Sequence, residues 1–466
     1  MNVLLIDPPW VIENKKNLWR KVGSCLPSLG LAYIAAVLEK AGHKVKILDC
    51  TAEKVSLDIA GDKLEQIKQN IIPDFIGLTA TTPIFPNALK VAKICRNLFP
   101  KAKIVFGGVH PTVRPDEALS YDFVDYVVRD EGEETMLELV SGKKPLSILG
   151  LSYKSKGKII HNKLRPLIKD INKIPIPAYH LLPMSKYYPA LGSYKRLPAM
   201  SIFATRGCPG RCTFCHRAFR GVVRARSARS IANEIKTLQK EYGIKEVAFY
   251  DDTFTLFKKV VLEFCNILIK EKIGIAWSCF TRADFIDEEM LRGMRKAGCH
   301  LILFGVESAD EQILKNINKR ISLEQVKKVV KLAKKIGVET RASFMIGNPG
   351  ETEETIKKTV QFAIKLDPDE IQFNITTVYP GTEMFDWAEK NGYIITKDWS
   401  KYNMSDIVMK LPTVSPETIM YYYGLVHRKF YLRPRIILRR LLKIRSFTQL
   451  KQEIKGALAV LGGFKI

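Results

Sequence analysis

The first third of the chain alternates short apolar runs with segments of helical periodicity. VLLID (3–7), KVKILD (44–49) and KIVFGG (103–108) have the length and apolar character of buried parallel strands, and SLGLAYIAAVLEKAG (28–42) has the spacing of a helix. A strand, a crossover helix and a second parallel strand form one unit, and such units in series build an open, doubly wound sheet. Residues 1–150 are therefore predicted to form a Rossmann-like α/β domain, whose ligands bind beyond the carboxyl ends of its strands.

A second alternating series begins near residue 199. Six apolar runs, from SIFATRG to EIQFNITTVYPG, are separated by segments of helical spacing. Six parallel strands in series predict a partial (β/α)6 barrel of the TIM type over residues 199–411, again with functional groups at the strand ends. The Pro- and Tyr-rich stretch 151–198 has no periodicity and is predicted to be a connector. Residues 412–466 are predicted to form a basic helical region.

Composition sets the broad class of the protein. The chain has 466 residues, which suits two or three domains, and no apolar run approaches the roughly 20 residues needed to span a bilayer. The N-terminal MNVLLIDPPW has no basic region and no cleavage site, so it is predicted to be a folded strand and not a signal peptide. Nine cysteines without a paired framework indicate a reducing cytosol, and we expect a cytoplasmic protein. The net charge of +26 favours an anionic partner, or is a solvated lysine-rich surface.

Three cysteines cluster in TRGCPGRCTFCH (205–216), directly after a predicted strand. Cys208, Cys212 and Cys215 have the spacing C-x3-C-x2-C, and clustered thiolates suit soft metals. A structural zinc ion needs four ligands, and although His216 could complete the set, adjacent side chains rarely point the same way. A [4Fe–4S] cluster held by three cysteines keeps one iron open, and an open iron can chelate a small molecule through its amine and carboxylate.

This motif resembles that of the radical S-adenosylmethionine (SAM) superfamily, in which the open iron binds the methionyl end of SAM. The aromatic Phe214 before the last cysteine also fits. YDDTFT (250–255) departs from the superfamily, because it stands where a Gly-Gly-Glu turn usually binds the SAM amino group. The resemblance makes Asp251 and Asp252 the substitutes for that turn, unless they only cap the helix expected from 257.

Two further strand ends carry expected SAM contacts. GVES (305–308) resembles the segment beside the ribose or amino end of SAM, and FMIGNPGET (344–352) resembles the fifth-strand motif that backs the adenine. Arg341 is expected to face the same cavity, or to form a salt bridge. The expected contacts from these segments are Glu307, Ser308, Arg341, Ile346, Gly347 and Glu351. The resemblance implies that SAM is split to a 5′-deoxyadenosyl radical with an electron from an external donor of flavodoxin or ferredoxin type.

Three segments of the N-terminal domain resemble the cobalamin-binding domain that is fused to radical SAM enzymes. They are PSLGLAYIAAVLEKAGHKVKILD (27–49), GGVHPT (107–112) and EGEET (131–135). The usual D-x-H-x-x-G motif is absent, because Pro-Pro-Trp follows Asp7, so no histidine is expected to ligate cobalt from below. The expected cobalamin contacts are Pro8, Leu29, Gly30, Thr79, Thr81, Gly107, Gly108, His110, Glu131 and Gly132. His110 is expected to stabilise its loop and not to bind cobalt. The alternative is a domain that has lost cobalamin and serves as a scaffold.

Methylthiotransferases that act on tRNA are a rival family, because they join an N-terminal α/β domain with three more cysteines to the same type of barrel. The candidates here are Cys25, Cys50 and Cys95, and the positive charge would suit RNA. Their contexts are those of helix and strand interiors, and no pattern of an RNA-binding β-barrel follows the second domain. We predict buried structural cysteines and no nucleic-acid partner.

The C-terminal region is strongly basic. Residues 427–445, HRKFYLRPRIILRRLLKIR, hold eight Lys or Arg and no acid, and GALAVLGGF (456–464) is apolar but too short to span a membrane. Such a segment can lie in an anionic membrane interface, bind nucleic acid, or pack on the barrel. The first expectation is peripheral association with the inner face of the membrane through 427–464, which suits a small, membrane-embedded substrate.

The two resemblances together imply a cobalamin-dependent radical SAM enzyme with a [4Fe–4S] cluster, SAM and cobalamin as cofactors. Relatives of this architecture include hopanoid methylases and the oxidative cyclase of bacteriochlorophyll synthesis, which suggests a lipid-like or tetrapyrrole-like substrate. The expected reaction is methylation of an unactivated carbon. The alternatives are a radical oxidation, cyclisation or rearrangement without methyl transfer, and a non-catalytic cobalamin or iron–sulfur binding protein.

Overall fold

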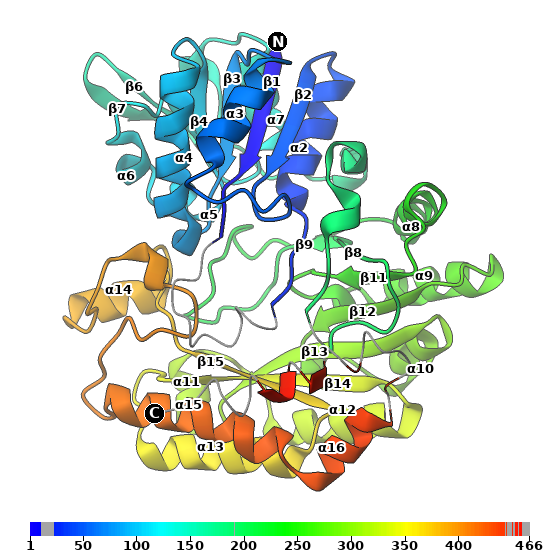
Figure 1. Ribbon diagram of the computed structural model, residues 1–466. Helices are drawn as coiled ribbons and strands as arrows, with labels where there is room; N and C mark the ends of the chain where they lie inside the picture. The colour runs from blue at the N-terminus through cyan, green and yellow to red at the C-terminus, as the bar shows by residue number, and fades with distance from the viewer. Residues whose placement is uncertain are drawn as a thin grey trace.

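The computed structural model describes residues 1–10, 23–190 and 192–442, and short pieces beyond them (444, 450, 453–454 and 456–458). The chain forms two α/β domains, drawn in blue to cyan and in green to yellow in Figure 1. The C-terminal segments, in orange to red, lie along the second domain. The α/β class with a doubly wound sheet and a partial barrel is confirmed.

The first domain is built on a seven-stranded sheet with the order β2-β1-β3-β4-β5-β6-β7. Its five parallel strands are β1 (Asn2–Asp7), β2 (Lys44–Asp49), β3 (Phe75–Thr79), β4 (Lys103–Gly107) and β5 (Tyr126–Val128). Its helices are α2 (Leu29–Lys40), α3 (Ala60–Lys68), α4 (Phe85–Leu98), α5 (Val109–Val113), α6 (Pro115–Leu119) and α7 (Glu133–Val140). Helix α2 packs beside α7 and α3 packs beside α4, as expected for crossover helices that cover the faces of a sheet.

The sheet does not end at residue 150, where the sequence placed the start of the connector. Strands β6 (Leu151–Ser155) and β7 (Lys158–His161) form an antiparallel hairpin that pairs with β5. Both strands are short, and β7 is largely exposed, so they lack the apolar character of the five parallel strands. An edge hairpin of this kind has a weak sequence signal, because only one of its faces needs to be apolar.

The second domain is a six-stranded parallel sheet with the order β15-β14-β13-β12-β11-β8. The strands are β8 (Ala199–Ile202), β11 (Glu246–Phe249), β12 (Ala276–Thr281), β13 (Cys299–Glu307), β14 (Glu339–Ile346) and β15 (Glu370–Ile375). The helices that alternate with them are α8 (Ala228–Tyr242), α9 (Lys258–Lys270), α10 (Glu288–Lys296), α11 (Glu311–Asn316), α12 (Leu323–Ile336), α13 (Glu353–Leu366) and α14 (Glu383–Lys390). The strand order follows the chain order, so the carboxyl ends of all six strands lie at one end of the partial barrel.

Local sequence signals position these elements. Helix α12 begins with a capping box between Ser322 and Gln325 and ends at Gly337, whose φ is +83°. Behind the sheet, Phe249, Phe264 and Trp277 pack with their rings mostly edge to face, 5.6 to 5.7 Å between centroids. This aromatic cluster fixes α9 on β11 and β12, and therefore fixes the loop between β11 and α9 that faces the cysteines.

The C-terminal region begins as a packed part of the barrel. Helix α15 (Pro416–Tyr431) lies against β15 and α13, and its Val426 and Phe430 are fully buried. Helix α16 (Pro434–Leu441) follows, with Arg439 paired to Asp369. Among the described residues, no helix is both long and apolar enough to cross a membrane. Most of GALAVLGGF (456–464) lies outside the described residues.

Candidate functional site

The three cysteines lie in the loop that follows β9 (Thr205–Arg206), at the carboxyl end of the barrel strands. Cys212 is buried, Cys208 is half-buried and Cys215 is exposed, and all three are free thiols. The backbone N–H of Cys215 donates to the carbonyl of Cys212 over 3.1 Å, which turns the chain back between these two ligands. We call residues 208–215 the cysteine loop.

Asp251 holds the entry to the cysteine loop from the barrel side. Its carboxylate accepts hydrogen bonds from the backbone N–H groups of Ala204, over 3.0 Å, and of Thr205. The side chain is almost fully buried, and burial raises its pKa to about 7 despite these bonds. Asp251 therefore shapes the loop instead of presenting a free carboxylate, whereas the neighbouring Asp252 is exposed and accepts a hydrogen bond from the backbone of Gly207.

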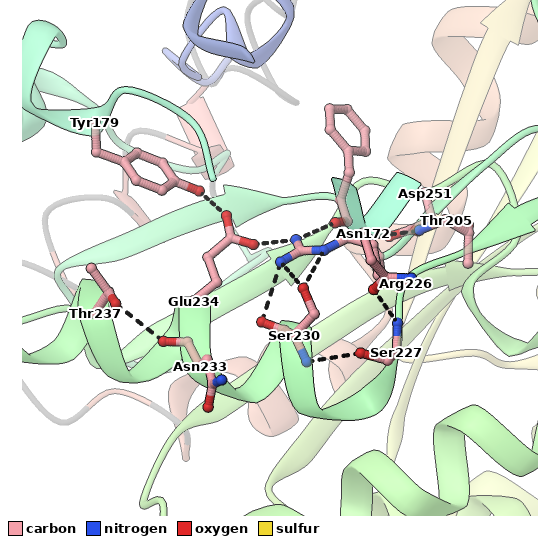
Figure 2. A network of polar contacts seen from close by, with 12 residues as sticks. Asn172, Tyr179, Thr205, Arg226, Ser227, Ser230, Asn233, Glu234, Thr237 and Asp251 are labelled. Carbon is pink, nitrogen blue, oxygen red and sulfur yellow. Dashed lines mark hydrogen bonds and ion pairs between the residues drawn. The ribbon is translucent and has the colours of Figure 1, made fainter. Parts of the chain in front are cut away.

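A second polar network, centred on Arg226, holds the same stretch (Figure 2). The guanidinium of Arg226 donates to the carbonyl of Phe203 over 3.0 Å and pairs with Glu234 of α8. Tyr179, from the connector, donates its hydroxyl to the same glutamate. The backbone N–H of Arg226 donates to Ala204 over 2.8 Å. The entry to the cysteine loop is thus held by two sets of buried polar contacts, which is the rigid support that a cofactor site needs.

The thiols lie in a positively charged environment. A hydrogen bond with Cys215 lowers the pKa of the Cys212 thiol to about 6 against the effect of burial, and the charges of Lys319 and Arg282 lower it further. Thr253 and the backbone of Gly210 each lie 3.4 Å from the sulfur of Cys208. A low thiol pKa favours the thiolate, which is the form that binds iron.

Gly210 is required by close packing within the cysteine loop. A Cβ at this position would lie 3.3 Å from the sulfur of Cys208 and 3.4 Å from Nη1 of Arg282. Arg282 is itself held by Asp284, with 2.9 Å between Nε and Oδ1. Arg282 is therefore held in a salt bridge, and its charge still acts on the thiols.

Lys319 is a site residue that the sequence analysis missed. Its Nζ lies 2.7 Å from Oε1 of Glu307, and both side chains are buried. Glu307 has a φ of +71°, which is uncommon for a residue other than glycine. A Cβ at Gly305 would clash with the Glu307 carboxylate and lie 2.8 Å from Nζ of Lys319, so a side chain there would displace this ion pair. No motif marks Lys319 in a lysine-rich chain; only its place in the loop after α11, near the cysteine loop in space, identifies it.

The turn after β14 is built by its own glutamate. One carboxylate oxygen of Glu351 accepts from the backbone N–H groups of Gly347 and Asn348, the latter over 2.9 Å. Burial raises the pKa of Glu351 to about 7. Ile346 is fully buried, and Ser308 bonds to Thr359 over 3.2 Å. The side chains of Glu351, Ile346 and Ser308 are thus used to hold the strand ends. A ligand at this place would therefore meet the backbone of the turn.

Arg341 is not brought to this end of the barrel. It stands near the start of β14, opposite Glu370 at the start of β15, and the two form an ion pair. Its guanidinium also donates to Ser193 of the connector over 3.0 Å. The salt-bridge alternative therefore holds for Arg341, because the side chain closes the amino-terminal end of the barrel.

The expected cobalamin contacts gather at the strand ends of the first domain, with different roles. Gly108 has a φ of +93°, and a Cβ there would lie 2.8 to 2.9 Å from backbone and side-chain atoms of Ala80 and Thr79. Glycine is therefore required at position 108, because the loop after β4 lies directly against the end of β3. A Cβ at Gly30 would meet no atom within 4 Å. The remaining small and apolar positions lie beside these loops. Pro8 and Leu29 are buried, Gly107 and Gly132 are partly buried, and Thr81 is exposed.

His110 is buried and packs between the two domains. Its Nδ1 lies 3.3 Å from the Thr82 hydroxyl, and its ring lies 4.2 Å from that of Phe85 and 5.3 Å from that of Trp399. Its Nε2 has no hydrogen-bond partner among the described residues and lies 3.7 Å from the Glu117 carboxylate. These contacts support the expectation that His110 stabilises its loop.

Glu131 joins the two domains. Its carboxylate lies 2.7 Å from Arg206 and 2.8 Å from Arg224, and it accepts from the backbone N–H of Ile168 over 2.8 Å. Arg206 also pairs with Glu133 over 2.6 Å. The carboxylate is thus fully engaged with the barrel domain, and Arg206 stands only two residues before Cys208.

Cys25, Cys50 and Cys95 are buried and free. Burial raises the pKa of the Cys95 thiol to about 12, as expected for a thiol that packs like a small apolar side chain. Among the described residues, no three His, Cys, Asp or Glu side chains converge as a single metal ion would require. In a [4Fe–4S] cluster each thiolate binds a different iron, so the three clustered thiols, with the pKa of Cys212 lowered and the cations Lys319 and Arg282 beside them, fit that group.

Comparison with known proteins identifies the family. The profile of the radical SAM superfamily matches residues 202–363, and that of the B12 binding domain matches residues 16–140. An uncharacterized methyltransferase of Pyrococcus horikoshii is 38% identical, over 99% of this chain and 98% of that protein. The anaerobic magnesium-protoporphyrin IX monomethyl ester cyclase of Rubrivivax gelatinosus is 31% identical, over 88% of this chain and 74% of that protein.

A solved structure shares the fold of the whole chain. OxsB, a cobalamin-dependent S-adenosylmethionine radical enzyme solved with aqua-cobalamin and S-adenosylmethionine bound, superposes with a TM-score of 0.73 at 18% identity. The superposition covers 99% of this chain and 72% of that chain. Because the identity to the Pyrococcus protein extends through both domains, the chain belongs to the family of cobalamin-dependent radical SAM enzymes.

Proposed function

We propose that the protein transfers a methyl group to an unactivated carbon of an apolar substrate. The observation that carries the proposal is the link between the two cofactor domains. Arg206, two residues before Cys208, is held by Glu131 and Glu133 of the first domain, so the cysteine loop is tied directly to the cobalamin-binding domain. A methyl donor in one domain and a hydrogen-abstracting radical in the other must reach the same carbon atom, and this link sets their separation.

Each residue of the site has a role in this proposal. Cys208, Cys212 and Cys215 would hold the cluster, Lys319 would bind the carboxylate of SAM, and Asp252 would bind its amino group. The bound cofactors would supply the electron, the 5′-deoxyadenosyl radical and the methyl group. The chain itself orients and shields them: the turn at Gly347 backs the adenine, and the buried supports described above keep the cysteine loop in place.

The apolar character of the substrate rests on two observations. The Rubrivivax relative is named for a magnesium-protoporphyrin ester. In addition, α16 exposes Ile437, Leu438 and Leu441 beside the exposed Arg435. An apolar helix face rimmed by arginine suits the interface of an anionic membrane, so we propose that α16 associates peripherally with the inner face of the membrane, where an apolar substrate would be found.

A second candidate function is a radical oxidation or cyclisation without methyl transfer. The identity of 31% to the Rubrivivax cyclase favours it. The residues of the cysteine loop serve both reactions equally, because both begin with abstraction of a hydrogen atom. Only the fate of the substrate radical differs between the two candidates.

The test is an anaerobic reconstitution of the full chain with iron, sulfide and hydroxocobalamin, followed by SAM and a strong reductant. Retained cobalamin is measured by its visible spectrum, and 5′-deoxyadenosine and S-adenosylhomocysteine are measured by mass spectrometry. Methyl transfer predicts retained cobalamin and both products. The second candidate predicts 5′-deoxyadenosine without S-adenosylhomocysteine. A protein that binds cobalamin but forms neither product would overturn both, with Cys212→Ala as the negative control.

A further inference from the structure

A groove of about 940 Å³ lies on the outside of the barrel, between α11, α12 and α13. Its floor contains the apolar side chains of Leu314, Ile321 and Phe362. Its rim is mostly cationic. The charged residues that line it are Lys315, Arg320, Lys327, Lys358 and Lys365, against Glu311 and Glu324. An apolar floor with a charged rim is the composition of a protein–protein docking surface.

A single loop separates this groove from the thiols. Asn318 lines the groove, and its amide donates to the carbonyl of Arg211, in the cysteine loop, over 2.8 Å. The backbone N–H of Thr213 donates to the carbonyl of Ile317 over 3.1 Å. Lys319 lies between two groove residues in sequence, yet its Nζ is buried on the inner side, 6.0 Å from the ring centroid of Phe214. The loop 317–322 thus has the groove on one side and the cysteine loop on the other.

The positive charge of the groove is only partly neutralised. Lys327 pairs with Glu324, and Lys358 pairs with Asp310 over 2.9 Å. Within the described part of the chain, Lys315, Arg320 and Lys365 have no carboxylate within salt-bridge distance. All three are exposed, and their field therefore extends into solvent and attracts an acidic surface.

We propose that this groove docks an acidic, low-potential electron-carrier protein that reduces the cluster. The proposal rests on the proposed function and adds the location of its redox partner. The ion pairs of Arg206 with Glu131 and Glu133 turn the mouth of the barrel toward the cobalamin-binding domain, whereas the groove lies on the outside of the barrel, between helices. One electron passes through the loop 317–322; the carrier is oxidised by one electron, the cluster is reduced by one electron, and no proton crosses.

The test compares two charge-reversed variants of the full chain. The groove variant is Lys315→Glu/Arg320→Glu/Lys365→Glu. The matched control is Lys90→Glu/Lys93→Glu/Lys101→Glu, which makes the same change in charge at exposed positions of the first domain. Binding of oxidised bacterial flavodoxin is measured by titration calorimetry at low ionic strength. Reduction of the cluster is followed by stopped-flow absorbance, with reduced flavodoxin and, separately, with dithionite.

The proposal predicts that the groove variant binds flavodoxin at least about tenfold more weakly and is reduced by it correspondingly more slowly, because electrostatic steering contributes about 10- to 1,000-fold to association. Dithionite, which needs no docking surface, should reduce both variants at the wild-type rate. The control variant should bind flavodoxin within about twofold of wild type, and the difference between the variants should shrink at high salt.

Equal flavodoxin affinity of the groove variant and wild type overturns the proposal. An equal loss of affinity in the groove and control variants overturns it as well, because it would show that the net charge of the whole protein, and not this groove, attracts flavodoxin. If the groove variant fails to retain iron, Lys315→Glu/Lys365→Glu replaces it, because neither residue belongs to the loop 317–322. Binding is measured independently of turnover. If the wild-type protein forms no 5′-deoxyadenosine with dithionite, the proposed function is contradicted. The docking proposal is then still judged by the flavodoxin binding of the groove and control variants.

Discussion

Trp399 donates its indole N–H to the carboxylate of Glu117 over 2.6 Å, and this bond crosses from the barrel domain to the cobalamin-binding domain. Burial acts to raise the pKa of Glu117, but the nearby His110 ring and the hydrogen bonds from Trp399 and Arg114 outweigh it and lower the pKa to about 2. The carboxylate is therefore charged at neutral pH and holds the two domains together through partners on both.

Glu117→Ala should loosen the domains while leaving each of them folded. The loss of a charged hydrogen bond at a partly buried site is expected to cost about 1–3 kcal/mol. Limited proteolysis should cut the connector between the domains several-fold faster than in wild type. Glu65→Ala, on the exposed face of α3, is the control and should leave the rate unchanged. Equal rates for wild type and Glu117→Ala would show that Glu117 does not hold the interface.

Gly210→Ala should impair cluster assembly without unfolding the chain. The added methyl group would lie 3.3 Å from the Cys208 sulfur, and it would also press on Arg282. We expect at least about a twofold loss of bound iron after reconstitution, with an unchanged circular dichroism spectrum. Gly274→Ala is the matched control, because a Cβ there meets no atom within 4 Å. Full iron content in Gly210→Ala would contradict the packing argument.

Replacement of Lys319 separates its structural role from its binding role. Lys319→Met leaves the buried Glu307 carboxylate without its partner, and breaking a buried pair in this way costs about 3–5 kcal/mol. Lys319→Met/Glu307→Gln removes both charges and should recover most of the lost stability. If Lys319 binds the carboxylate of SAM, the double variant should bind SAM at least about tenfold more weakly than Glu307→Gln alone in equilibrium dialysis. Equal affinity of the stable double variant and Glu307→Gln would assign Lys319 a structural role only.

The pH dependence of stability should carry the signature of Asp7. Burial, and then the charge of Asp49, raise the pKa of Asp7 from 3.8 to about 8 in the folded protein. Between these values the folded state binds the proton and the unfolded state does not, so this group makes the protein less stable as the pH rises. From pH 6 to pH 8 the loss approaches about 2 kcal/mol.

Asp7→Asn removes this titration and should flatten the dependence of the urea midpoint on pH over that window. The control Asp62→Asn, at an exposed position of α3, should keep the wild-type slope. A wild-type slope in Asp7→Asn would show that the carboxyl ionises normally in the folded protein.

Periodicity predicted the parallel strands and crossover helices because their apolar residues must face a core on both sides of a sheet. The hairpin of β6 and β7 was not predicted from the sequence, because an edge strand needs little apolar surface. The site was predictable where chemistry restricts the residue type, as with the three cysteines. It was not predictable where the fold decides the partner: the sequence cannot show that Arg341 meets Glu370, or that Lys319 meets Glu307.

The ion pairs of Arg206 have a consequence for maturation of the enzyme. The first domain is synthesised before the cysteine loop, so Glu131 and Glu133 are already folded into it when Arg206 leaves the ribosome. Docking of the barrel on that domain then draws the segment before Cys208 into its final path. A chain that carries its first domain should therefore present the three thiols to the iron–sulfur assembly machinery with Arg206 already held, whereas an isolated barrel would hold this segment only through Asp251 and Arg226.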